Sequence, residues 1–406
     1  MKEIKILQVN TVCGKGSVGR IMVDLYKLCE KQGFSPLIAY GRDEANADLN
    51  TYKIGSKPDF YRHVLRNFFL GESGFGSKKQ TKELIGWIET QKPDLIHLHN
   101  IHGFYLQVED LFEYLKKAKI PVVWTLHDCW PFTGHCAFFD YIECEKYKTG
   151  CHDCAIHRSA YPYALFKDNS KIAYRDKRQA FCGVENLTIV TPSKWLGDLV
   201  KESFLKEYPV QVIYNGIDLE AFLPMEQKID GILPDKKVIL GVANVWEKRK
   251  GLVYFEKLAD KLPKEFQIVL VGLSEKQKKD LLKRYTKDRL LPLCRTGGVK
   301  ELAALYSVAD LYVNATLEDN FPTTNLEALA CGTPVLTFDT GGSKESLDET
   351  CGKWVKKGDI DALCQEIVSM TKNGKSKEAC RRKALEFDAT KRFEEYISLY
   401  RKELNA

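Results

Sequence analysis

The chain has 406 residues, of which 44% are apolar and 29% are charged, and its formal net charge is +6. This length predicts about two or three domains with sizeable cores, and the composition excludes a disordered or fibrous chain. The charge lies far from the strongly basic balance of a nucleic-acid binder. No apolar run approaches the ~20 residues of a membrane span, and no signal-peptide core follows Met1, so we expect a cytoplasmic protein.

The first strand is expected at residues 5–9 and runs into a glycine-bearing loop. Gly14, Gly16 and Gly19 satisfy the G-x-G-x-x-G fingerprint between a strand and a helix. The acid that would hold the ribose of a dinucleotide is absent at Tyr40, where the second strand ends. The loop therefore favours another phosphate-bearing ligand over a nicotinamide cofactor, because glycine lets a ligand approach the backbone.

The stretch 56–80 mixes Phe, Arg and Gly. It fits either a partly buried helix with a loop, or a rim that touches an acceptor or a membrane surface. A strand is expected next, at residues 95–99, and alternation places His97 and His99 on the same face of it. Each could be a core histidine or a ligand-binding one. His102 comes after that strand and is better placed to line a cleft, since ligands sit beyond the carboxyl ends of parallel strands.

His127 follows the next expected strand, residues 121–126. A histidine at the carboxyl end of a parallel strand lies where active sites form in open α/β sheets. We therefore rank His127 first among the eight histidines of the chain.

A cysteine-rich insertion, residues 129–154, comes directly after this histidine. Its C-x7-C-x6-C-x2-C spacing could hold a structural zinc ion, with the ligands Cys136, Cys144, Cys151 and Cys154. The alternative is a set of small buried hydrophobic side chains in a loop. With no export signal, the thirteen cysteines predict reduced thiols or metal ligands rather than disulfides. A catalytic zinc is not indicated, because four thiolates leave no open position.

A second α/β pattern begins with the strand 238–242, after a linker near 215–218. Its first loop carries three consecutive cations, Lys248 to Lys250, before a helix. A lysine at a helix start after a parallel strand is well placed to bind a diphosphate. We therefore assign Lys250 to the ligand first and Arg249 second.

The stretch 309–344 reads as strand, loop, short helix and strand. The helix is expected at 323–330, begun by a Thr cap. Asp319 in the loop and Glu327 in the second helical turn could face one ligand, because helical side chains lean toward the N-terminus. Amides at the helix start suit a phosphate, which places the donor along Asn320, Phe321, Pro322, Thr323 and Thr324. Acids for hydroxyls and amides for phosphate indicate a sugar nucleotide.

We expect two Rossmann-like domains of the α/β class. The first comprises residues 1–215 plus 386–406, because the amphipathic helix expected from about 384 to 404 has enough apolar surface to cross back onto it. The second, residues 216–385, would bind the nucleotide sugar. Ligand binding is thus expected at the carboxyl ends of both sheets.

With these features the chain resembles the family 4 glycosyltransferases, which have the GT-B architecture of two Rossmann-like domains facing across a cleft. The most specific part of the resemblance is the family's E-x7-E motif, which Asp319 and Glu327 match and which continues through residues 328–335. Residues 215–218 and 309–310 also match. The resemblance implies transfer of a sugar from a UDP- or GDP-sugar with retention at the anomeric carbon.

The same resemblance implies a role for each candidate residue. Glu327 would hold the ribose, Asp319 the hydroxyls of the donor sugar, and Lys250 the diphosphate. Gly16 would bring its amide to the same phosphates, and His127 would contact the reacting sugar. No cofactor is required for catalysis, because cations and helix ends stabilise the leaving diphosphate.

The acceptor is expected to be a glycan or a lipid-linked glycan in surface or capsular polysaccharide biosynthesis. The protein would then contact the inner membrane face peripherally.

Three features depart from the family's pattern. The first acid is Asp319 rather than Glu, and Asn244 stands where the family usually carries Arg, so Arg249 or Lys248 would supply that contact. The insertion 129–154 resembles a subset associated with polysaccharide assembly.

Two other functions remain open on the sequence. A sugar-nucleotide epimerase of the same architecture would convert the donor without an acceptor. A non-catalytic protein that senses a nucleotide sugar or a glycan would bind donor without transfer or hydrolysis.

Overall fold

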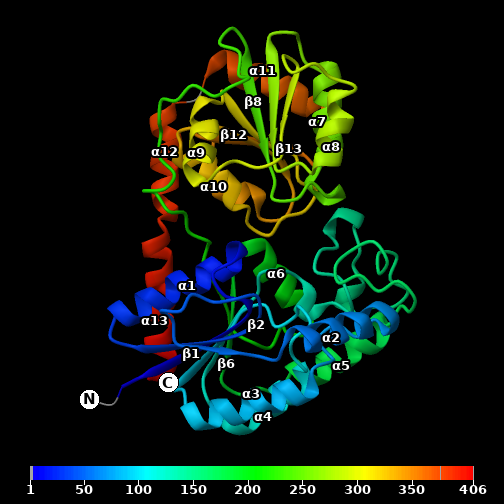
Figure 1. The fold of residues 1–406 in the computed structure, drawn as a ribbon, viewed down its shortest axis with the longest axis vertical. Coiled ribbons are helices and arrows are strands. Elements are labelled where there is room, and N and C mark those ends of the chain that lie inside the picture. Colours follow the sequence, from blue (N-terminus) through cyan, green and yellow to red (C-terminus); the bar gives the residue numbers. More distant parts are fainter. Residues whose placement is uncertain (1–2, 375, 406) are drawn as a thin grey trace. The chain divides into compact units, whose positions relative to one another are not determined.

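The computed structural model describes residues 3–374 and 376–405. The chain forms two compact units: unit 1 is Met1–Ile213 with Phe393–Ala406, and unit 2 is Tyr214–Arg392. Each unit is a parallel sheet flanked by helices (Figure 1). The two Rossmann-like α/β layouts expected from the sequence are therefore confirmed. No helix in the described part of the chain is both long and apolar enough to cross a membrane.

Unit 1 contains a seven-stranded parallel sheet in the order β3-β2-β1-β4-β5-β6-β7. The strand order changes direction between β1 and β4: strands β1 to β3 extend to one side and β4 to β7 to the other, and ligands bind at this switch point in such sheets. The strands are β1 (Lys5–Val12), β2 (Ser35–Arg42), β3 (Thr51–Lys53), β4 (Leu95–Leu98), β5 (Val122–Thr125), β6 (Leu187–Thr191) and β7 (Val210–Val212).

Helices cover both faces of this sheet. One face packs against a large apolar core that takes Leu84 from α3, Phe112 from α4 and Phe181 from α5. The opposite face receives α1 through Met22 and the C-terminal helix through Tyr400. The helices are α1 (Gly16–Lys31), α2 (Lys57–Leu70), α3 (Lys78–Gln91), α4 (Val108–Ala118), α5 (Ser170–Phe181) and α6 (Lys194–Glu202).

Unit 2 contains a six-stranded parallel sheet in the order β10-β9-β8-β11-β12-β13, with its reversal between β8 and β11. One core packs α9, α10 and α12 on one face, and a second packs α7 and α11 on the other. The strands are β8 (Lys237–Val242), β9 (Phe266–Val271), β10 (Leu290–Leu293), β11 (Leu311–Asn314), β12 (Val335–Asp339) and β13 (Gly352–Lys356). The helices are α7 (Leu252–Lys261), α8 (Glu275–Leu282), α9 (Val299–Val308), α10 (Thr323–Ala330), α11 (Ile360–Asn373) and α12 (Lys377–Ala384).

The C-terminal helix is shorter than the sequence predicts. We expected it from about residue 384, but α12 ends at Ala384 and α13 (Ala389–Leu404) begins after a break. The break exists because the intervening backbone pairs with Ile217, whose N–H donates to the Phe387 carbonyl at 2.8 Å. The expected return to the first domain is observed, since the end of α13 belongs to unit 1.

Two edge strands, β3 and β13, were not expected from the sequence. Both mix polar and apolar residues without a buried run, and only one side of an edge strand pairs, so a periodicity argument has little signal there. α1 also begins four residues earlier than expected, at Gly16, inside the glycine loop.

Candidate functional site

The loops that follow β8 and β11 carry most of the candidate residues of unit 2. These two strands pair at the switch point of the sheet, where the strand order changes direction. Lys250 ends a short 3-10 turn (Lys248–Lys250) after β8, and Asp319 lies in the loop after β11. Adjacent parallel strands deliver their following loops to one edge of the sheet, so the topology places the cationic and acidic loops side by side.

Lys250 and Asp319 form an ion pair through Nζ and Oδ2. Arg249 lies next to them, with its guanidinium 3.8 Å from the same carboxylate oxygen and 2.7 Å from the Glu318 carbonyl that it donates to. The Arg249 side chain is 12% exposed, whereas Lys248 and Asn244 are exposed at the surface. Of the two residues expected to replace the missing arginine, the structure therefore brings Arg249 to Asp319.

The carboxyl group of Asp319 is held in its charged form. Burial by itself would raise its pKa, but the charges of Lys250 and Arg249 outweigh burial and lower the pKa below its usual value. The backbone N–H of Asn320 also donates to this carboxylate and lowers the pKa further. That amide is consequently engaged with Asp319, which differs from our expectation that it is free for a phosphate.

Two glycines allow the loops to pack this closely. A Cβ on Gly251 would lie 2.0 Å from the Ala315 carbonyl oxygen, and one on Gly341 would lie 1.9 Å from the Asp319 carbonyl oxygen. Both have positive φ, 75° and 54°. The Gly342 N–H donates to the Asp319 carbonyl at 3.1 Å. The second glycine turn thus supports the backbone of Asp319.

Glu327 lies in the second turn of α10 and is oriented by a tyrosine. The Tyr306 hydroxyl, on α9, donates to Glu327 Oε2 at 2.9 Å. Burial raises the pKa of Tyr312 on β11, and the charges of both Glu327 and Asp319 add to that increase. Both acids of the motif therefore act on one buried phenol of the central strand.

The start of α10 has no side-chain cap. The helix spans Thr323–Ala330 as the sequence predicts, but its N-cap is Pro322, so the expected Thr cap is wrong. The helix is fixed instead by Asn325, whose amide donates to the Ser343 carbonyl at 2.9 Å, and by buried Phe321 against Tyr214. First-turn amides without a side-chain cap are the groups that bind anions at helix ends.

In unit 1, the glycine loop and His127 follow neighbouring parts of the sheet. Gly16 is the first residue of α1, with φ 65° and open space where a Cβ would be. Lys15 provides no side-chain cap for that helix. His127 follows β5, which pairs with β4 next to the reversal point. Burial lowers the pKa of His127 to about 4, so its imidazole is neutral near pH 7.

A chain of hydrogen bonds fixes the tautomer of His127. The Gln8 amide donates to the Met22 carbonyl, which turns its oxygen toward His99 Nε2 at 3.2 Å. His99 Nε2 therefore carries the proton, and Nδ1 accepts from His127 Nε2 at 3.2 Å. Neutral His127 is thus protonated on Nε2, which leaves Nδ1 as the acceptor.

The other histidines in and after β4 have structural partners. His97 and His99 share one face as alternation predicts, and both are buried. His97 bonds Tyr400 at 2.6 Å and Thr125 at 2.8 Å, which joins the sheet to α13. His102 bonds Asp128 Oδ2 at 2.9 Å. The structure thus favours the core interpretation for His97.

The cysteine-rich insertion packs against the core of unit 1. Cys136 donates a hydrogen bond to Cys154, which lowers the pKa of Cys154 to about 7, and the charge of Cys151 acts on Cys136. Within the described residues, no group of three or more His, Cys, Asp or Glu side chains is arranged to hold a metal ion. The zinc site at Cys136, Cys144, Cys151 and Cys154 stays a prediction from spacing, and the arrangement seen does not fit it.

Several residues of the site were not found from the sequence. Tyr306 reads as a core aromatic of its helix, and only the fold shows that its hydroxyl reaches Glu327. Arg381 is distant in sequence, yet it donates to the Ala330 carbonyl at 2.7 Å and so caps the carboxyl end of α10. Gln8 is an ordinary residue of β1, and its role depends on its contact with His99 across the sheet. No local sequence pattern predicts these contacts, because each joins residues that are far apart in the chain.

Comparisons with known proteins show the family of the chain. Residues 18–221 match the family described as Glycosyltransferase Family 4, and residues 225–387 match Glycosyl transferases group 1. WcaC of Escherichia coli K12, named for glycosyl transfer in colanic acid biosynthesis, is 24% identical over 98% of this chain and 99% of its own. An uncharacterised glycosyltransferase of Methanocaldococcus jannaschii is 26% identical over 78% of this chain and 73% of its own.

Solved structures share the fold. A sucrose-phosphate synthase from Thermosynechococcus elongatus has a TM-score of 0.72 at 16% identity and covers 98% of this chain and 99% of its own. Anabaena HepE in complex with UDP has a TM-score of 0.66 at 14% identity and covers 98% of this chain and 100% of its own. These likenesses establish the two-unit layout.

Proposed function

This chain belongs to glycosyltransferase family 4, and on that premise we propose that it moves a sugar from a UDP- or GDP-sugar to a glycan acceptor with retention at the anomeric carbon. In that reaction the bond between the anomeric carbon and the β-phosphate oxygen breaks. A bond to an acceptor hydroxyl oxygen forms, and the hydroxyl proton is released together with the nucleoside diphosphate. The half-site of Lys250, Asp319 and Glu327 in unit 2 is the observation that carries the proposal.

Each side chain of this half-site suits one part of a nucleotide sugar. Glu327 is an oriented acceptor for ribose hydroxyls, because the Tyr306 hydroxyl fixes its Oε2 and a carboxylate can accept several hydrogen bonds. Lys250 and Arg249 supply positive charge for the leaving diphosphate. Asp319 is assigned to donor-sugar hydroxyls, which a charged carboxylate binds well. Thr323 and Thr324 stand at the uncapped start of α10.

Donor binding would exchange the partner of Lys250. In the structure its ammonium group is paired with Asp319. A diphosphate brings at least two negative charges, so it competes for the ammonium and leaves Asp319 free for a sugar hydroxyl. The ion pair thus keeps both side chains in place before donor arrives.

Unit 1 is assigned to the acceptor side. From the resemblance, His127 contacts the reacting sugar and the amide of Gly16 contacts the phosphates. The relatives' names support a lipid-linked or surface-polysaccharide acceptor: one is a galactosyltransferase acting on a diphosphoundecaprenol-linked sugar in Escherichia coli. We accordingly propose a cytoplasmic enzyme in peripheral contact with the inner membrane face.

Turnover with a panel of UDP- and GDP-sugars tests this function. We expect release of nucleoside diphosphate from at least one donor. The NMR spectrum of the product should show the same anomeric configuration, axial or equatorial, as that of the donor. Conversion of the donor to its epimer without acceptor would instead indicate the epimerase. Donor binding without transfer or slow hydrolysis would indicate a sensor.

A further inference from the structure

Helix α2 of unit 1 turns apolar side chains to the outside. Tyr61, Leu65 and Phe69 follow one another at four-residue spacing, so they share a face, and they are 62%, 57% and 49% exposed. The inward face instead carries His63 and Asn67, which are both buried. A surface helix of a soluble protein normally has the opposite distribution.

The polar residues on the inward face are built into the fold. His63 bonds the Ser77 hydroxyl at 2.9 Å, and a Cβ on Gly76 would meet its ring at 2.7 Å. Asn67 donates to the Tyr163 carbonyl at 2.8 Å. Because these contacts fix the rotation of the helix, its apolar face cannot turn inward.

A neighbouring segment extends the outward apolar face. Phe166 is 63% exposed and stacks on Phe69 with ring centroids 5.0 Å apart. The Leu165 N–H donates to the Phe68 carbonyl at 3.0 Å. We call the exposed set the α2 patch; its members are Tyr61, Leu65, Phe69, Leu70, Leu165 and Phe166. Two segments about 100 residues apart in sequence thus contribute to one exposed apolar surface.

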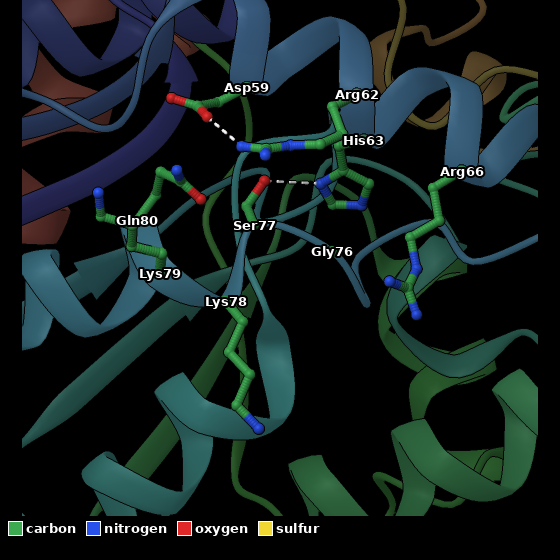
Figure 2. A pocket seen from close by; sticks show the side chains of 9 residues that line it. All are labelled: Asp59, Arg62, His63, Arg66, Gly76, Ser77, Lys78, Lys79 and Gln80. Carbon is green, nitrogen blue, oxygen red and sulfur yellow. Dashed lines mark hydrogen bonds and ion pairs between the residues drawn. The ribbon is translucent and has the colours of Figure 1, made fainter.

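Cations border this patch. A pocket of about 320 Å³ between α2 and the start of α3 is lined by Arg62, Arg66, Lys78 and Lys79, with Asp59 as its one acid (Figure 2). Arg62 and Arg66 alternate with Leu65 along the exposed face of α2.

Each cation has an acidic partner that is less exposed than itself. Arg62 is 74% exposed against 21% for Asp59, and Lys78 is 67% exposed against 18% for Asp110. The outermost charge beside the patch is therefore positive.

We propose that the α2 patch and its bordering cations dock on the surface of a bilayer that contains anionic phospholipid. Tyr and Phe rings are favoured at the water–lipid interface, and Arg can keep its charge among headgroups while its stem lies along the acyl chains. A helix with exposed Leu and aromatic residues beside Lys and Arg binds in the interface plane without spanning it. The inference rests on the peripheral membrane contact of the proposed function and assigns that contact to one surface; none of its residues belongs to the half-site of Lys250, Asp319 and Glu327.

Vesicle sedimentation tests the proposal on the full chain. Wild-type protein should bind phosphatidylcholine vesicles containing about a third phosphatidylglycerol and should bind pure phosphatidylcholine much less. Leu65→Ser/Phe69→Ser should weaken binding to the anionic vesicles by roughly tenfold or more, because the lost apolar area no longer leaves water. Leu282→Ser is the control; it removes a leucine that is 38% exposed on α8, outside the α2 patch, and should bind as wild type.

The bordering cations are tested separately. Arg62→Gln/Arg66→Gln should weaken binding to anionic vesicles and reduce its loss between about 0.1 M and about 0.5 M salt. Lys276→Gln/Lys279→Gln, which neutralises two exposed lysines on α8, should leave binding unchanged. Circular dichroism and nucleoside diphosphate release of all four variants should match wild type, which separates docking from folding and from sugar transfer.

Equal vesicle binding by wild type and Leu65→Ser/Phe69→Ser would overturn the proposal. Absence of binding by the wild type would also overturn it. If the wild type instead forms dimers that the same substitution disperses, and vesicles do not compete, the patch is a contact between two copies and the membrane assignment is wrong.

Discussion

Lys250 and Asp319 are ion-paired across two loops that leave neighbouring strands at the reversal point of the unit 2 sheet. The two residues are 69 positions apart, and Gly251 and Gly341 allow their loops to approach. A cation and an acid that hold each other in place suit a substrate with both phosphates and hydroxyls. Catalysis gains from charged groups that need no rearrangement when charge develops on a leaving group.

Removal of the ammonium group should weaken diphosphate binding. We expect Lys250→Ala to lower the affinity for UDP or GDP by about 10- to 100-fold, since hydrogen bonds to charged groups contribute ~1.5–3 kcal/mol. Calorimetric titration measures the change. Lys264→Ala is the control, because Lys264 is exposed and precedes β9, at the opposite edge of the sheet. An affinity for Lys250→Ala equal to that of the control would remove Lys250 from the site.

Addition of one methyl group should disturb the same loops. Gly251→Ala places a Cβ against the Ala315 carbonyl at positive φ, and we expect a loss of ~1–3 kcal/mol in the free energy of unfolding together with weaker nucleotide binding. Gly86→Ala should be neutral or stabilising, because Gly86 lies inside α3 with nothing within 4 Å of its Cβ position. Urea unfolding of both variants checks this, and equal stabilities would contradict the packing described.

Acid should destabilise unit 1 through its buried histidines. Burial lowers the pKa of His63, His127 and His135 to about 4, against about 6.5 in an unfolded chain. Below about pH 6.5 these histidines bind protons in the unfolded state but stay neutral in the folded state. The free energy of unfolding should therefore fall as pH drops from about 6.5 to about 4, by up to ~1.4 kcal/mol per pH unit for each such histidine.

Urea unfolding measured at several pH values checks this prediction. Two variants show whether the buried histidines cause the loss of stability. His63→Gln should reduce the acid slope by about one proton, because Gln can keep the bond to Ser77 and does not titrate. His152→Gln is the control variant, because the side chain of His152 is 54% exposed. A stability that stays constant from pH 6.5 to 4.5 would contradict the neutral buried state of these rings.

The tautomer of His127 is a separate prediction. At pH 7 the imidazole should carry its proton on Nε2, because Gln8 fixes His99 as an acceptor at Nδ1. Nitrogen chemical shifts of ¹⁵N-histidine-labelled protein report this directly. Gln8→Leu should allow both tautomers, whereas wild-type protein with its proton on Nδ1 would show that the hydrogen-bond chain runs the other way.

Most of the fold follows from strand and helix periodicity. Buried strands such as β9 and the short helix α10 are continuous signals, and α10 has the bounds that the sequence predicts. The break before α13 could not be predicted, because Phe387 and Asp388 pair with Ile217, a contact across the fold that leaves no local pattern. Edge strands β3 and β13 were missed for a similar reason.

The candidate site divides in the same way. Polar residues that follow strands made Lys250, Asp319 and His127 the candidates, since strand order and residue type are both readable from sequence. The supporting groups were not readable: Tyr306, Gln8 and Arg381 are defined by what they touch. The cysteine spacing predicted zinc, and elemental analysis of protein purified without added metal decides between one zinc per chain and free thiols.

Nucleotide binding by Glu327→Ala tests the central claim most directly. Wild-type protein and Glu265→Ala, an exposed control before β9, should bind UDP or GDP with equal affinity in a calorimetric titration. Glu327→Ala should bind at least about tenfold more weakly while its unfolding midpoint stays near wild type, because it loses a charged acceptor for the ribose. An unchanged affinity in Glu327→Ala would contradict the assignment of this half-site to the nucleotide.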